Sequence, residues 1–387
     1  MQSWRIDHRE LDYVTQLLRG GFPGHQDRNF TADLEALFAK TFGRKFAISF
    51  VNGTATLHAA LCAAGVKAGD EVIVPPLTMS STSLAVLQAG ATPVYADIDA
   101  DTFQISATAI EKMISPRTKA IMPVALYGLP PDLEAIMEIA KKHNLPVVED
   151  DAECYGGKVH GRLAGTFGDM ASFSFQNSKH VTCGEGGMVV TDDEELATRL
   201  RRFSSLGYSC VGAVPGASKI DKKMIARPDF IRHVEFGFNY RLNELSAAVA
   251  LAQMEKLGMF IEWRQRCAAA YDKVIDGVPF LKRQKTPDGY ENSYWAYTVE
   301  LDTDKVAWRD FYTKFCDFGG EGFYGAWRLA YDEPLFADII PPEHRVCPVA
   351  NRVQPRLMQF KTNYGDDASI AKECEALKKT VDWFIGK

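Results

Sequence analysis

The stretch Ser172-Phe-Ser-Phe-Gln-Asn-Ser-Lys-His-Val-Thr-Cys-Gly-Glu-Gly-Gly187 connects two short apolar runs, Ala171–Phe175 and Met188–Thr191, through a polar loop that ends in glycines. Apolar runs of this length predict strands that are buried on both faces. The loop places the amine of Lys179 just past the end of the first strand. A lone lysine is more often a surface cation. A functional role for Lys179 therefore depends on which side chains lie at the ends of the neighbouring strands.

Five further β-branched runs alternate with helical stretches, and they are Phe46–Phe50, Glu71–Val74, Thr92–Ala96, Ala120–Leu126 and Pro146–Glu149. This alternation predicts an α/β fold with a mostly parallel sheet of seven strands covered by helices. The carboxyl ends of parallel strands meet at one edge, where open α/β sheets bind ligands. We therefore expect the functional site at that edge.

The pattern changes after about residue 240. Leu242–Gly258 and Ile261–Val274 have helical periodicity, and a mixture of short strands, such as Tyr294–Leu301, and helices follows. We predict a large domain over residues 1–250 and a smaller α+β domain over residues 251–387. The stretch Gly207–Arg232 has no clear periodicity, which predicts a long loop.

Composition argues against several classes of protein. The chain has 387 residues, of which 46% are hydrophobic and 24% charged, as in ordinary globular proteins. A net charge of −6 argues against a nucleic-acid partner, and no apolar run approaches the roughly 20 residues that span a membrane. The N-terminus lacks a signal peptide's apolar core. Eight cysteines without CxxC pairs predict free thiols in the cytoplasm, with no metal site.

The first candidate site segment is Val51-Asn-Gly-Thr-Ala-Thr-Leu-His58, which follows a predicted strand and opens the helix Thr54–Ala64. Gly53 lets the backbone approach a ligand closely, and Thr54 adds a hydroxyl donor. The free amides at a helix N-terminus suit a phosphate. The same tripeptide is also typical of an ordinary turn with a helix cap, so the segment alone does not decide.

The second segment, Pro146-Val-Val-Glu-Asp150, is an apolar strand that ends in acid. Asp150 is either a helix cap or a carboxylate that faces a pyridine nitrogen. Ser174 precedes Lys179 by five residues, so its hydroxyl could reach the same phosphate as Thr54. Gly184-Glu-Gly-Gly187 supplies flexible backbone but lacks the Lys-Ser/Thr ending of a P-loop. Amine, carboxylate and phosphate donors together are the parts that pyridoxal 5'-phosphate requires.

The order and spacing of several strings resemble the DegT/DnrJ/EryC1/StrS aminotransferases over nearly the whole chain. The strings are Asn52-Gly-Thr-Ala55, Gly69-Asp-Glu-Val-Ile-Val-Pro75, Pro93-Val-Tyr-Ala-Asp-Ile-Asp99, Val148-Glu-Asp150, Phe173-Ser-Phe-Gln-Asn-Ser-Lys179, Gly184-Glu-Gly-Gly187 and Phe238-Asn-Tyr-Arg-Leu-Asn-Glu244. The resemblance implies a fold-type I transferase that depends on pyridoxal 5'-phosphate, with a three-layer large domain and a smaller C-terminal domain.

The resemblance also implies residue roles. Lys179 would form the Schiff base with the cofactor and then shuttle a proton, while Asp150 would pair with the pyridinium. Asn239 would reach the phosphate from a neighbouring subunit, which implies a homodimer with shared active sites. The cofactor-binding set is then Gly53, Thr54, Ala55, Met79, Asp150, Glu153, Ser174, Lys179 and Asn239.

Two of these positions are unusual. Met79 stands where the family usually has an aromatic residue that stacks on the pyridine ring, although sulfur against a ring is still favourable. Glu153 matches a position near the phenolic oxygen of the cofactor. A carboxylate beside a phenolate is repelled unless one of the two is protonated, so the role of Glu153 stays open.

The implied reaction moves an amino group from glutamate, or a similar amino acid, to the ketone of a nucleotide-linked keto-deoxysugar. Pyridoxamine 5'-phosphate would be the intermediate carrier, and the pathway would make a polysaccharide or an antibiotic. A cyclitol or an aminohydroxybenzoate-type acceptor is an alternative. A sugar dehydratase is another, but dehydratases of the family carry histidine in place of the lysine, and here His180 only adjoins it. A non-catalytic regulator would need a broken site.

Acceptor-binding residues are the least determined. A basic loop could pair with a diphosphate or simply be solvated, and its members are Lys219, Lys222, Lys223 and Arg227. The segment Phe323-Tyr-Gly-Ala-Trp-Arg328 offers side chains that either line an acceptor pocket or belong to the core. These candidates are Tyr324, Trp327 and Arg328.

Overall fold

A computed structural model describes residues 4–21, 28–214, 223, 226–336 and 338–386. Its centre is a sheet with the strand order β3-β2-β4-β5-β8-β9-β1. The strands are β1 (Phe46–Phe50), β2 (Glu71–Val74), β3 (Thr92–Tyr95), β4 (Thr118–Ile121), β5 (Val148–Asp150), β8 (Met170–Ser174) and β9 (Gly187–Thr191).

This sheet forms from two hydrogen-bonded groups of strands. The group β3-β2-β4 joins the group β5-β8-β9-β1 through two parallel bridges, Ile121 to Val147 and Val124 to Asp150. Among these seven strands β9 alone runs antiparallel to both neighbours, β1 and β8. The prediction of a mostly parallel seven-stranded sheet is therefore confirmed.

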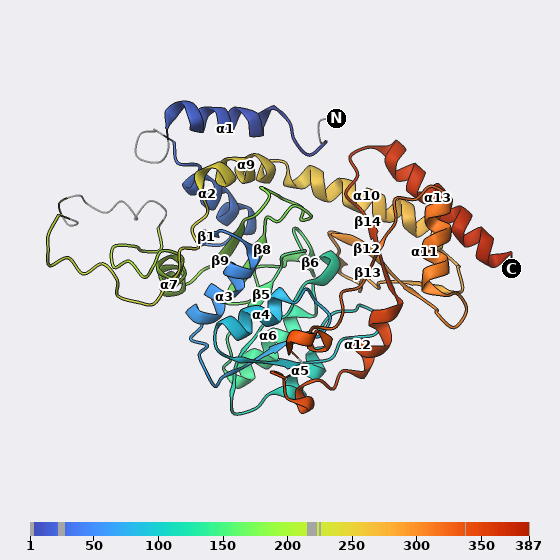
Figure 1. The fold of residues 1–387 in the computed structure, drawn as a ribbon, viewed down its shortest axis with the longest axis horizontal. Helices are drawn as coiled ribbons and strands as arrows, with labels where there is room; N and C mark the ends of the chain where they lie inside the picture. The colour runs from blue at the N-terminus through green and yellow to red at the C-terminus, as the bar shows by residue number, and fades with distance from the viewer. Residues whose placement is uncertain (1–3, 22–27, 215–222, 224–225, 337, 387) are drawn as a thin grey trace.

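Alternate side chains of the strands enter different cores, so both faces of the sheet are covered. In β2, Val72 and Val74 join one hydrophobic cluster, and Ile73 joins another on the opposite face. The first face is covered by α3 (Gly53–Ala63), α4 (Ser81–Gln88) and α7 (Glu194–Ser204). The second is covered by α2 (Phe30–Phe42), α5 (Ala107–Met113), α6 (Leu133–His143) and α9 (Glu244–Met254), with α1 (His8–Gly20) packed on α9 (Figure 1).

A second, antiparallel sheet lies beside the first, at the right of Figure 1, in the order β10-β12-β14-β13. Its strands are β10 (Leu281–Arg283), β12 (Ala296–Leu301), β13 (Tyr324–Gly325) and β14 (Leu357–Lys361). It shares a core with α10 (Leu257–Ile275), α11 (Trp308–Asp317) and α13 (Asp367–Ile385). Strands and helices thus mix here as the α+β expectation requires, while the division at residue 250 stays a prediction.

Short elements complete the described chain. They are a small sheet of β6 (Lys158–Val159), β7 (Arg162–Leu163) and β11 (Tyr290–Glu291), the helix α12 (Pro348–Val353), and single 3-10 turns at Leu126–Gly128, Ala330–Asp332, Pro334–Phe336, Pro342–His344 and Gln354–Arg356. No helix within the described ranges is long and apolar enough to cross a bilayer.

Two predicted elements differ from the observed ones. The predicted helix Leu242–Gly258 is interrupted between α9 and α10, where the buried Nζ of Lys256 lies 2.5 Å from a carboxylate oxygen of Glu10. The predicted strand Ala120–Leu126 ends at Ile121 as a regular strand. Residues 123–125 continue beside β5 with a single bridge, Val124 to Asp150, and a 3-10 helix begins at Leu126.

Candidate active site

A cavity of about 850 Å³ opens where the carboxyl ends of β5 and β8 face the second sheet. One wall comes from the first turn of α3 and the ends of the two strands, and the other comes from β13 and the segments around it. The lining residues include Asn52, Gly53, Thr54, Met79, Asp150, Glu153, Ser174, Lys179, Trp295, Tyr324, Trp327 and Gln359. Segments far apart in sequence therefore meet at the edge where we expected the site.

Lys179 reaches this cavity from the loop that follows β8. Its Nζ lies 2.9 Å from Oε1 of Glu153 and 4.6 Å from the centre of the Trp295 ring. The other carboxylate oxygen of Glu153 accepts the backbone amide of Tyr127 at 3.1 Å. The Lys179 and Glu153 side chains are only 12% and 5% exposed. The amine is thus held by a buried carboxylate and does not extend into solvent.

Asp150 ends β5 and is 3% exposed. Its Oδ2 accepts the hydroxyl of Thr82 at 3.0 Å, and its Oδ1 accepts the amide of Ala152 at 3.3 Å. Burial raises the pKa of Asp150 to about 6, since the charged form loses its hydration. A cationic group placed against this carboxylate would restore the charged form.

The two acids that flank Asp150 do not line the cavity. Glu149 accepts the amides of Gly165, Phe167 and Gly168 at 2.6 to 2.8 Å and so organises a loop. Asp151 is buried, and burial raises its pKa well above the usual value. Alternation of side chains along an extended chain accounts for the different surroundings of Asp150 and Asp151.

The first turn of α3 forms the polar end of the cavity. The side chain of Asn52 accepts a hydrogen bond from the backbone amide of Ala55 at 2.8 Å, so this amide is not free to bind a ligand. Ala55 is also not among the lining residues. The amides of Gly53 and Thr54 precede the first intrahelical bond and line the cavity. A Cβ on Gly53 would lie 2.8 Å from Cβ of Ser174. A side chain at position 53 would therefore clash with Ser174, and the free amides of the helix N-terminus lie beside the hydroxyls of Thr54 and Ser174 at one end of the cavity.

An aromatic wall faces Lys179. The rings of Trp295 and Trp327 stack with centroids 5.7 Å apart, and Tyr127 stacks on Trp327 at 6.3 Å. Tyr324 and Met79 also line the cavity and are 67% and 48% exposed. Sequence reasoning anticipated Trp327, Tyr324 and Met79 but missed Trp295, Tyr127 and Thr82, because no local pattern shows that these three approach the loop or Asp150.

Two expected residues lie outside the cavity in this chain, and a third is not described. Asn239 is exposed and forms a bridge with Ser205, outside the cavity. Arg328 is exposed and is not among the lining residues, although Trp327 beside it is. Lys219 lies outside the described residues.

The basic loop is only partly described, because Lys222 also lies outside the described residues. At its other end, Nη2 of Arg227 pairs with Asp229 Oδ2 at 2.7 Å on the surface. That ion pair satisfies the Arg227 charge within the loop.

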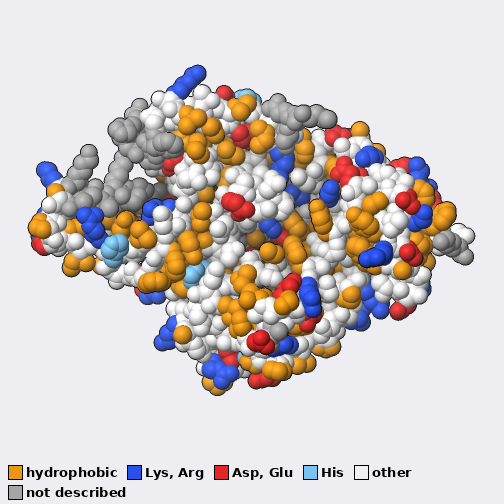
Figure 2. Space-filling model, viewed as in Figure 1, with side chains coloured by type: hydrophobic (Ala, Val, Ile, Leu, Met, Phe, Trp, Pro, Cys, Tyr) orange, Lys and Arg blue, Asp and Glu red, His pale blue; other side chains and the backbone are white. Residues whose placement is uncertain are grey.

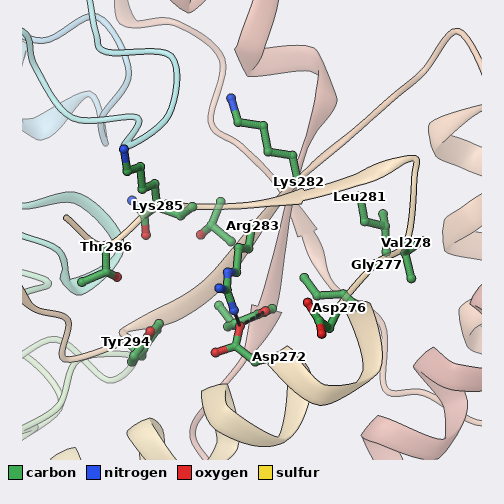
Figure 3. Close-up of a pocket in the computed structure, with 14 residues that line it drawn as sticks. Asp272, Asp276, Gly277, Val278, Leu281, Lys282, Arg283, Lys285, Thr286 and Tyr294 are labelled. Carbon is green, nitrogen blue, oxygen red and sulfur yellow. Dashed lines mark hydrogen bonds and ion pairs between the residues drawn. The ribbon is translucent and has the colours of Figure 1, made fainter. Parts of the chain in front are cut away.

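A second cavity of about 500 Å³ lies between the end of α10 and β10 (Figure 3). Two of its basic residues form ion pairs: Arg283 with Asp272 at 2.9 Å, and Lys282 with Asp101 at 2.6 Å. None of the residues expected from the sequence lines it. The described residues also contain no group of three or more His, Cys, Asp or Glu side chains placed to bind a metal ion.

Comparisons with known proteins place this site in a family. The model of the DegT/DnrJ/EryC1/StrS aminotransferase family matches residues 5–364. The chain belongs to this family. GDP-perosamine synthase from Caulobacter vibrioides is 38% identical over 311 residues, which cover 79% of this chain and 78% of the relative.

Solved structures agree with this assignment. DesV from S. venezuelae superimposes with a TM-score of 0.83 at 28% identity, over 97% of this chain and 94% of that one. A 3-amino-5-hydroxybenzoic acid synthase superimposes with a TM-score of 0.85 at 26% identity, over 98% and 97% of the two chains. The fold-type I transferase expected from the sequence is confirmed, and the protein is an aminotransferase.

The raised pKa of Asp150 predicts that its charged form lowers the stability of the ligand-free fold at neutral pH. Because its folded-state pKa is raised, its contribution to stability is greatest below pH 4 and is lost as the pH rises towards 6. At pH 7.5, the free energy of unfolding of Asp150→Asn should therefore exceed that of the wild type by up to about 3 kcal/mol. This difference in free energy should be smaller at pH 4.5. Chemical denaturation at both pH values measures this, and a variant less stable than wild type at pH 7.5 would contradict it.

Proposed function

We propose that the protein binds pyridoxal 5'-phosphate in this cavity and moves an amino group from glutamate, or a similar amino acid, to the ketone of a GDP-linked keto-deoxysugar. The single observation that carries the proposal is the meeting of Lys179, Asp150 and the first turn of α3 in one cavity. These groups fit the aldehyde, the pyridine nitrogen and the phosphate of that cofactor. The Caulobacter relative supports the GDP-linked acceptor.

Each residue of the cavity would act on the part of the cofactor that it faces. When bound, the cofactor supplies an aldehyde that carries the amino group and a ring that accepts electrons. Asp150 keeps the ring nitrogen protonated, and Gly53, Thr54 and Ser174 anchor the phosphate. Lys179 holds the aldehyde and then moves a proton at the α-carbon of the amino acid.

Glu153 and the aromatic wall support Lys179. The carboxylate of Glu153 forms an ion pair with Nζ at 2.9 Å, so its negative charge has a partner in this cavity. The stacked rings of Trp295 and Trp327 exclude water from one side of the amine. We propose that Glu153 keeps the amine near the cofactor carbon.

One alternative acceptor has support of its own. The similarity to 3-amino-5-hydroxybenzoic acid synthase favours an acceptor that lacks a nucleotide, such as a cyclitol or an aminohydroxybenzoate-type ketone. The cavity does not distinguish these acceptors, because the exposed Tyr324 at its mouth suits a ring of either kind. The presence of Lys179 argues against a dehydratase.

A spectral titration tests the activity and the acceptor together. Glutamate should bleach the absorbance that the bound cofactor gives with Lys179, and the correct ketone should restore it. We expect GDP-linked keto-deoxysugars to restore it at least about tenfold faster than dTDP- or UDP-linked sugars or keto-cyclitols. Lys179→Ala should show neither change. Full turnover by Lys179→Ala, or equal rates with every ketone, would contradict the proposal.

The role of Asp150 has a matched control in its neighbour. Asp150→Asn should lose at least about tenfold in affinity for the cofactor, because the partner of the ring nitrogen loses its charge. Asp151→Asn removes an equally buried acid outside the cavity and should bind the cofactor as wild type does. Equilibrium dialysis measures both affinities. Equal losses in the two variants would show that buried charge in general, and not its position, governs binding.

We propose that two copies of the chain share their active sites. Two described segments, residues 205–214 and 226–240, form an arm that projects from the α7 side, at the left of Figure 1, and Figure 2 shows hydrophobic side chains gathered near it. Phe236 and Ile231 on this arm are 80% and 69% exposed, and they precede Asn239 by three and eight residues. An exposed apolar arm of this kind is typical of a subunit interface. A second copy would cover it and receive Asn239 at its phosphate.

Mixing inactive variants tests this dimer. In a heterodimer of Lys179→Ala and Asn239→Ala, one site regains both native residues, so random pairing should restore about a quarter of wild-type activity. The control mixes Lys179→Ala with Asp150→Asn, whose changes lie in the cavity of one chain, and should restore none. Activity of the first mixture no higher than that of its parents would refute the shared site.

We also propose a cytoplasmic location. All eight cysteines have free thiols in the structure, which suits a reducing compartment.

A further inference from the structure

The loop that carries Lys179 is held through its carbonyl groups. Four consecutive carbonyls, those of residues 177–180, accept hydrogen bonds from side chains of distant segments. Arg5 donates to three of them: Nη1 to the carbonyl of Asn177 at 3.1 Å, and Nη2 to those of Lys179 and His180 at 2.7 and 2.8 Å. This loop has no regular secondary structure of its own, so these bonds define its path.

The fourth carbonyl is held from the second sheet. Nε1 of Trp295 donates to the carbonyl of Ser178 at 2.9 Å, and Nη2 of Arg264 approaches the same oxygen at 3.5 Å. Arg264 is fully buried and also donates to the carbonyl of Trp295 and the hydroxyl of Thr362, each at 2.9 Å. No carboxylate among the described residues lies within ion-pair distance of Arg264. Burying such a cation costs free energy. The hydrogen bonds of Arg264 go to the lysine loop and to the residues that hold it.

Arg5 is itself fixed on both sides. Its carbonyl accepts from Gln253 Nε2 at 2.6 Å and from Lys256 Nζ at 2.9 Å, in the interruption between α9 and α10. The preceding residue, Trp4, packs edge-on against Phe260 at 5.6 Å. Trp4 also fills the space beside Gly365, where a Cβ would lie 2.3 Å from its ring. The N-terminal segment therefore joins the region before α13 to the lysine loop.

We propose that Arg5 and Trp295 are positioning residues for Lys179, supported by Arg264, and that the N-terminal segment is thereby part of the active site. A planar guanidinium with several donors can hold neighbouring carbonyls at fixed angles, which a lysine cannot do. Fixing the backbone at residues 177–180 restricts where Nζ can go. It directs the amine towards Glu153 and the face of the Trp295 ring. This inference rests on the proposed function of Lys179.

The step that should respond is the covalent capture of the cofactor. Nζ forms a bond with the aldehyde carbon, the aldehyde oxygen leaves as water with two of the three ammonium hydrogens, and the third hydrogen stays on nitrogen. A displacement of the amine by about 1 Å slows such a step strongly. Binding of pyridoxamine 5'-phosphate, which has no aldehyde, depends on the rest of the cavity and not on Nζ.

The experiment compares these two quantities in the purified full-length protein. Borohydride trapping followed by peptide mass measurement gives the rate at which Lys179 captures pyridoxal 5'-phosphate, and dialysis gives the affinity for pyridoxamine 5'-phosphate. We expect Arg5→Met and Trp295→Phe to slow capture at least about tenfold. Their affinity for pyridoxamine 5'-phosphate should stay within about twofold of wild type. Trp295→Phe keeps an aromatic ring and removes the N–H donor, so it remains informative if Arg5→Met folds poorly.

Arg44→Met is the matched control. Arg44 is also buried and also binds backbone carbonyls, those of Gly165 and Gly168, but it lies outside the cavity. It should capture the cofactor at the wild-type rate. Unchanged capture in both test variants, or an equal slowing in Arg44→Met, would overturn the inference. If borohydride did not trap the cofactor on Lys179 in the wild type, that result would instead contradict the proposed function.

Discussion

The buried ion pair between Lys179 and Glu153 is the interaction on which the site depends. A primary amine and a carboxylate at 2.9 Å, both almost fully buried, are costly to bring together unless each has further partners. Glu153 has the amide of Tyr127, and Lys179 has the face of Trp295. Tyr127 lies in the turn after β4 of the first sheet, and Trp295 directly precedes β12 of the second. The surroundings of the pair are therefore complete only when the two sheets lie against each other.

The sheet and its polar edge could be predicted from the sequence because short apolar runs are local signals. The position of Asp150 and Lys179 at this edge could be predicted for the same reason, since Asp150 ends one such run and Lys179 follows another by four residues; their roles stay predictions. Thr82, Trp295 and Arg5 were not found. Each acts through a contact with a residue at least 68 positions away, and nothing in their own segments indicates the partner.

The acids at the end of β5 show how one short segment serves two purposes. Glu149 satisfies three loop amides and holds the scaffold, whereas Asp150 lines the cavity. Burial raises the pKa of Glu149, Asp150 and Asp151 alike. Position, and not a raised pKa, therefore distinguishes Asp150 as the acid that faces a ligand.

The antiparallel direction of β9 has a consequence for motion. Because β8 and β9 are neighbours in one ladder, the loop between them is tethered at both ends, and Gln176 and Gly184 form a further bridge inside it. The backbone around Lys179 is thus anchored to the sheet on both sides of the loop. Travel of the amine would then come mainly from rotation about the side-chain bonds of the lysine, and such rotation would first have to break the ion pair with Glu153.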